Sequence, residues 1–137
     1  MKNLIFLLLI TLSSFVSWQK DNAAINNGLT GKWELTEYLI SPGDPGAWYP
    51  ADNTTRHIIK FRTDGSFTSS NGIYNGATKY QRTDSVRIKF LQPQTGTETK
   101  CYFSIEDNNQ TLIISPIGCI EGCSNKYKAV ENDDKGK

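Results

Sequence analysis

The sequence predicts an all-β protein that folds as a single antiparallel up-and-down barrel of about eight strands. Three observations support this prediction: short segments alternate apolar and polar residues, turn-forming residues separate them, and no helical periodicity persists after residue 30. The short connections suit an antiparallel meander, because parallel strands need long crossovers. Closure into a barrel buries every apolar face and removes exposed edges. A two-sheet sandwich is the competing architecture, since its strands carry the same pattern.

Each expected strand is a run of alternating residues that ends at Gly, Asn, Asp or Pro. The expected strands are residues 32–40, 57–62, 67–70, 78–82, 86–91, 100–105, 111–115 and 125–130. Asp64-Gly65 predicts a tight hairpin, because these residue types tolerate the positive φ that such turns require. The side chains expected to face inward are Trp33, Leu35, Ile59, Phe61, Phe67, Tyr80, Ile88, Phe90, Phe103, Ile105, Leu112, Ile114 and Tyr127, with Val86 on the face of Ile88.

Gly31-Lys32-Trp33 at the start of the first expected strand resembles the Gly-x-Trp signature of the lipocalins. Residues 29–130 are similar to the lipocalin-like domains of exported and lipoprotein-type Bacteroidetes proteins, through residues 31–35, Phe61 to Phe67 with Asp64-Gly65, and the closing segment Cys119–Cys123. The resemblance implies a barrel with the Trp at its closed end. It also implies a basic side chain from the last strand covering that Trp, for which Lys126 and Lys128 are the candidates.

The N-terminus has the pattern of a secretory signal peptide. Lys2 precedes a nearly unbroken apolar run from Leu4 to Leu12, which is too short for a permanent membrane span. Residues 15–18 resemble a bacterial lipobox in which Trp18 stands where the lipidated Cys belongs. We therefore expect a signal peptide at 1–18, a polar tether at 19–28, a domain at 29–130 and a disordered tail at 131–137. The protein should be exported to the periplasm, the cell surface or the medium.

The charge balance indicates which partners to expect. The chain has 15 basic and 14 acidic residues, and one basic residue, Lys2, belongs to the leader, so the remainder is neutral. Neutrality gives no reason to expect nucleic acid as a partner. Membrane association is expected only through an uncleaved or lipidated N-terminus. We expect a monomer that carries no cofactor.

The three cysteines lie in the C-terminal third of the chain, and export permits a disulfide. Cys119 and Cys123 are the expected pair, because Gly118 and Gly122 let a five-residue loop close. Pairing of Cys101 with either of them is the alternative. One cysteine is left over in each case, and we expect a buried Cys101. Two cysteines near Glu121 are too few ligands for structural zinc, so no metal is expected.

Two interpretations of function remain open. In the first, the barrel is a calyx for a small hydrophobic ligand. The residues expected to line it are Trp33, Phe61, Phe67, Tyr80, Phe90 and Phe103, with Trp48 and Tyr49 in the long loop 41–55 gating the open end. In the second, the side chains fill the interior, and the domain is a cell-surface or periplasmic interaction module without a ligand. An enzyme is not expected, because His57, the only histidine, has no nucleophile at a recognisable spacing.

Overall fold

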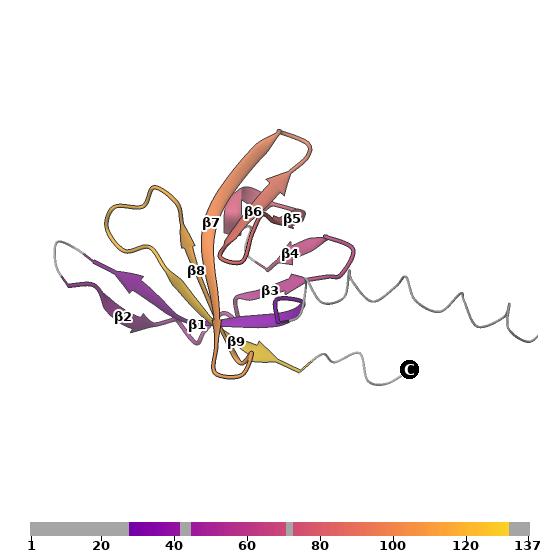
Figure 1. Ribbon diagram of the computed structural model, residues 1–137. Helices are drawn as coiled ribbons and strands as arrows, with labels where there is room; N and C mark the ends of the chain where they lie inside the picture. The colour runs from indigo at the N-terminus through magenta and orange to yellow at the C-terminus, as the bar shows by residue number, and fades with distance from the viewer. Residues whose placement is uncertain (1–27, 42–44, 71–72, 132–137) are drawn as a thin grey trace, which may run out of the picture.

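The computed structural model describes residues 28–41, 45–70 and 73–131, and within these ranges the chain is all-β (Figure 1). One helical turn, α3, interrupts the strands between β4 and β5. The elements are β1 (Gly31–Ile40), β2 (Ala47–Pro50), β3 (Ile58–Phe61), β4 (Phe67–Ser69), α3 (Ile73–Gly76), β5 (Lys79–Arg82), β6 (Arg87–Gln92), β7 (Thr97–Glu106), β8 (Thr111–Pro116) and β9 (Asn125–Val130). The predicted signal peptide, tether and tail lie outside the described residues, apart from Gly28 and Glu131.

The strands form one antiparallel sheet that is nearly closed into a barrel, as predicted. Its order is β4-β3-β1-β9-β8-β7-β6-β5, and β2 pairs with β1 beside this path. The first and last strands are neighbours, with Leu35 opposite Tyr127. At the remaining seam, Phe67 N donates to Thr78 O at 2.8 Å and Tyr80 N donates to Gly65 O at 3.0 Å. A sandwich of two separate sheets is thereby excluded.

The turns follow from residue types that tolerate left-handed backbone. In the β3–β4 hairpin, Gly65 has a φ of 84°, and the Asp64 carboxylate accepts the Ser66 N–H at 2.8 Å. Asp107, Asn108 and Asn109 between β7 and β8 have φ values of 52°, 54° and 66°. Asn and Asp are the non-glycine residues that enter this region most readily, because their short side chains form local hydrogen bonds.

The predicted core is largely confirmed. Eleven of the thirteen inward-facing residues are buried, and Leu35 and Ile105 are partly buried against them. Cys101 is buried, as expected. The prediction that Val86 faces inward with Ile88 is wrong, since Val86 is 49% exposed. Its N–H donates a hydrogen bond to the Asp84 carboxylate in a turn, and β6 begins only at Arg87.

Leu29 and Trp33 are both part of the core, at the start of β1. The Trp33 Nε1–H donates to Leu29 O at 2.9 Å, and both side chains are buried. The prediction that Lys126 covers Trp33 is wrong. The Lys126 Nζ lies 4.1 Å from the centre of the Trp48 ring instead. Alternation along β9 explains this placement, because Tyr127 points into the core and its neighbour Lys126 therefore points outward, opposite Glu37.

The loop expected at 41–55 contains a strand. Residues 47–50 pair with the second half of β1, which is ten residues long and continues past its contacts with β3. The end of β1, β2 and the loop 117–124 together form a projecting ribbon, which Figure 1 shows extending away from β5 and β6. β7 also starts earlier than expected, at Thr97 instead of residue 100.

Candidate functional site

The barrel interior contains a cluster of aromatic rings supplied by the strands. The Phe61 ring lies 5.1 Å from Phe67, 4.9 Å from Tyr80 and 6.0 Å from Phe90, and the Phe67 and Phe90 rings are 4.8 Å apart. These separations are typical of favourable ring packing. The structure therefore brings together four of the six interior residues that the sequence predicts to bind a ligand, with Trp33 and Phe103 buried in the same core.

One ring in this cluster comes from outside the barrel wall. Tyr74 belongs to α3, which connects β4 to β5 beside β6 (Figure 1), yet its side chain is only 8% exposed. Its ring stacks on Phe90 at 4.1 Å with an interplanar angle of 6°, and meets Phe67 at 6.0 Å. The Tyr74 ring is therefore part of the barrel core, although it does not come from a strand.

The buried end of Tyr74 reaches a polar point in an otherwise apolar interior. Its hydroxyl lies 3.0 Å from the Tyr127 hydroxyl, so the two hydroxyls form a hydrogen bond inside the core. Burial raises the pKa of Tyr74 well above its usual value and raises the pKa of Tyr127 to about 12. Burial also raises the pKa of the nearby Cys101 thiol to about 12. These groups therefore stay neutral at physiological pH, and the site favours neutral hydrogen-bonding groups over anions.

The backbone at Tyr74 is strained. Its φ is 61°, whereas the other described non-glycine residues with positive φ are Asp107, Asn108 and Asn109, which tolerate that region. A bulky residue held there costs roughly 1–3 kcal/mol, and such residues concentrate at ligand clamps and switches. The ring packing and the hydroxyl pair must offset this cost. The sequence signal for Tyr74 is an aromatic residue in a glycine-bounded connection, which periodicity does not detect.

The two residues predicted to gate the open end lie on the projecting ribbon. Tyr49 stacks on Tyr38 at 6.1 Å, and Trp48 lies under Lys126, which also pairs with Glu37. Trp48 and Tyr49 are 37% and 43% exposed. Neighbouring strand residues point to opposite faces, so these two rings cover the two sides of the ribbon. Their contacts are separate from the interior cluster.

The disulfide between Cys119 and Cys123 is present, with Cα atoms 6.0 Å apart. It closes the outer part of the projecting ribbon and leaves Ile120 97% exposed. The loop is tied to β1 by two backbone hydrogen bonds, from Leu39 N to Ser124 O at 2.7 Å and from Ser41 N to Glu121 O at 3.2 Å.

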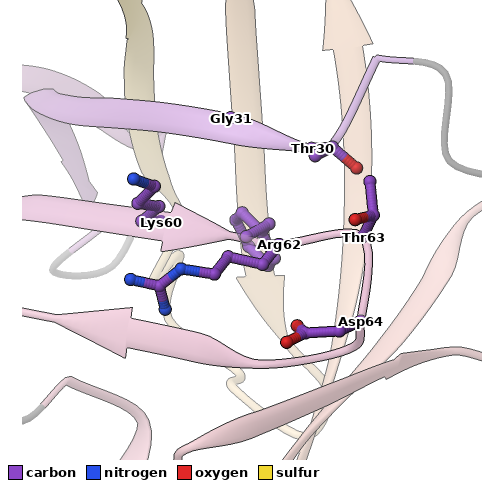
Figure 2. A pocket seen from close by; sticks show the side chains of 7 residues that line it. Thr30, Gly31, Lys60, Arg62, Thr63 and Asp64 are labelled. Carbon is purple, nitrogen blue, oxygen red and sulfur yellow. The ribbon is translucent and has the colours of Figure 1, made fainter. Parts of the chain in front are cut away.

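Two hollows lie on the outside of the described barrel. The first, of about 350 Å³, is lined by Thr30, Gly31, Lys60, Phe61, Arg62, Thr63 and Asp64. Figure 2 shows its charged side chains spread along the β3–β4 hairpin. The second, of about 310 Å³, contains the Lys89–Glu98 ion pair at 3.5 Å. Charged and apolar groups together line both hollows.

No three His, Cys, Asp or Glu residues within the described ranges are grouped so that they could hold a metal ion. No helix in the described part of the chain is long and apolar enough to cross a membrane. His57 contributes its backbone carbonyl to the Leu35 N–H at 2.9 Å, next to the β1–β3 pairing.

Comparison of the chain with known protein families, with curated proteins and with solved structures finds no match. The resemblance to the lipocalins therefore remains a prediction from sequence.

Proposed function

We propose that this domain is an exported, lipocalin-like barrel that binds a small hydrophobic ligand and performs no catalysis. The observation that carries the proposal is the ring of Tyr74, which fills the interior from a connecting segment. In a barrel filled only for stability, side chains of the wall suffice, because eight strands leave an interior about one side chain wide. Here a residue with a strained backbone, outside the strands, supplies part of the filling.

The chemistry of the interior supports the same proposal. Ligand pockets are mainly apolar and contain a few polar groups that fix orientation. The wall rings of Phe61, Phe67 and Phe90 supply the apolar part, and the Tyr127 hydroxyl supplies the polar part. Export is supported by the leader pattern and by the Cys119–Cys123 disulfide, which persists in oxidising compartments.

Native mass spectrometry after exposure to a lipid extract tests the proposal. We expect the purified chain to retain small molecules, and Trp48→Ala to retain them equally, because that ring lies on the projecting ribbon and not in the barrel. A clean unliganded mass for the parent chain would contradict ligand binding. If only Trp48→Ala failed to retain small molecules, the result would indicate that the ligand binds on the projecting ribbon.

A second candidate function is supported by the surface of the projecting ribbon. Of the seven large hydrophobic residues that are exposed in the described chain, five lie on it: Ile40, Trp48, Tyr49, Ile117 and Ile120. Trp48 and Tyr49 lie on opposite sides of the ribbon, so apolar side chains are exposed on both of its faces, and exposed apolar surface is typical of interaction sites. We propose an interaction module that works through this ribbon as the alternative.

Binding of labelled protein to cells of its own source tests this alternative. Ile120→Asp should reduce binding at least tenfold, because it places a charge on the most exposed apolar side chain of the ribbon. Tyr102→Asp is the matched control, since Tyr102 is also exposed but lies on β7. Equal binding by both variants and the parent would contradict a role for the ribbon.

A further inference from the structure

We infer that Tyr74 is a displaceable internal plug, and that the ligand of the barrel is a flat, phenol-like aromatic molecule that takes the place of the Tyr74 ring. The inference rests on the proposed ligand-binding function and names its chemistry. It starts from the environment of one side chain. Tyr74 lies against Phe90 and Phe67 and ends at the Tyr127 hydroxyl, so this slot already holds a phenol ring.

The slot selects ring shape and a hydroxyl group. The near-parallel face of Phe90 at 4.1 Å accepts a planar ring better than a branched chain. The Tyr127 hydroxyl offers a hydrogen bond at the far end of the slot. A ligand without a polar group would leave this hydroxyl unsatisfied, which costs binding free energy. A neutral hydroxyl fits better than an anion, because burial disfavours charge there.

The attachment of Tyr74 makes it displaceable. It belongs to a single turn of four residues, Ile73–Gly76. The N–H of the following residue, Ala77, donates to Tyr74 O at a long 3.2 Å. Withdrawal of the ring would release the left-handed strain at φ 61° without breaking a strand pair. Tyr80 differs, because it belongs to β5, lies opposite Phe90 in the sheet, and donates its hydroxyl to Arg62 O at 2.8 Å. Its withdrawal would open the barrel wall.

A plug and a ligand that compete for one slot have a quantitative consequence. The measured affinity equals the affinity of the empty slot multiplied by the fraction of molecules in which the plug is withdrawn. Tyr74→Phe removes the hydroxyl pair and weakens the plug, so ligand affinity should rise. Tyr74→Gly removes the plug and suits the positive φ, so affinity should be highest.

Titration of the full chain with p-cresol and with toluene tests the inference, with binding followed by NMR chemical shifts. We expect p-cresol affinity to rise severalfold from the parent to Tyr74→Phe and further in Tyr74→Gly. In Tyr74→Gly, p-cresol should bind about tenfold more tightly than toluene, and the added change Tyr127→Phe should remove that preference. Tyr102→Phe, the loss of an exposed tyrosine hydroxyl on β7 away from the slot, should leave p-cresol affinity unchanged.

Amide exchange supplies a second measurement on the parent chain. Saturating p-cresol should accelerate exchange at Tyr74, Gly76 and Ala77 as the plug leaves, while the amides of β6 stay protected. Equal p-cresol affinity in the parent and in Tyr74→Phe would overturn the inference, and so would toluene binding as tightly as p-cresol in Tyr74→Gly. If the parent still retains molecules from a lipid extract, either result leaves the proposed function standing. A parent that retains nothing and binds neither probe overturns both.

Discussion

The hydroxyls of Tyr74 and Tyr127 are the polar centre of an apolar barrel, and their neutrality is part of what holds it together. Both are buried and hydrogen-bonded to each other at 3.0 Å. Ionisation of either would place a charge among the rings of Phe67 and Phe90. The cost of that charge appears as the raised pKa of each tyrosine.

Stability should therefore fall at high pH. The pKa of Tyr127 is about 12 in the folded protein and near 10 when unfolded. A raised pKa gives stability that is complete below pH 10 and is lost as the pH rises through 12. Tyr127 alone should account for roughly 2–3 kcal/mol over this window, so chemical denaturation of Tyr127→Phe should show a shallower decline. Tyr102→Phe, an exposed control, should follow the parent. Parallel curves for Tyr127→Phe and the parent would contradict this.

Cys101 should behave as an inert thiol in the folded protein. It is fully buried on β7, and burial raises the pKa of its thiol to about 12, so very little thiolate is present at pH 8. Iodoacetamide at pH 8 should leave the native chain unmodified and add one group after denaturation without reductant, because Cys119 and Cys123 are joined. Mass spectrometry detects the difference. Rapid native labelling that is absent in Cys101→Ala would contradict the burial.

At the residue scale, the sequence predicted most of the strand residues that face the interior, but it did not predict that Tyr74 is buried there. Alternation identifies Phe61, Ile88 and Phe90 as inward-facing, because strand geometry imposes a period of two. Val86 continues the same alternation but lies in a turn, where the Asp84 carboxylate captures its N–H. Tyr74 lies outside every strand, so no periodicity predicts that its ring is buried.

At the element scale, the long strand β1 serves two structures. Its first half pairs with β3 and β9 in the barrel, and its second half supports β2 and the disulfide loop. The eight barrel strands could be predicted because each has an apolar face. β2 could not, because Ala47–Pro50 contains a proline and has no buried face, so only its pairing with β1 makes it a strand.

Removal of the disulfide should loosen the projecting ribbon and leave the barrel folded. Closing a five-residue loop contributes about 2 kcal/mol in the chain-entropy model, so Cys119→Ser with Cys123→Ser should cost no more than that in denaturant unfolding. Amide exchange should accelerate at Leu39 and Ser41, whose N–H groups bond to this loop. Exchange at Phe103 in β7 serves as the control. Global unfolding, or no change at Leu39, would contradict this division.

At the scale of the whole molecule, the nearly closed sheet surrounds an interior that side chains fill. Leu29 and Trp33 are buried at the start of β1, and the pairing of β1 with β9 joins the first and last strands of the wall. Pattern and connection length predicted this closure, because an antiparallel meander of short strands buries its apolar faces best by closing. What fills the interior depends on how the connection after β4 folds back, and local sequence patterns do not specify that.

The crystal structure of Tyr74→Gly tests the central claim most directly. Glycine removes the ring and accepts the left-handed backbone at this position, so the wall should keep its shape. We expect the strands to stay in place and a slot to open between Phe67, Phe90 and Tyr127, empty or holding a small molecule. Collapse of Phe90 and Tyr127 into that space would show that Tyr74 is an ordinary core residue and would contradict the account of a plugged binding barrel.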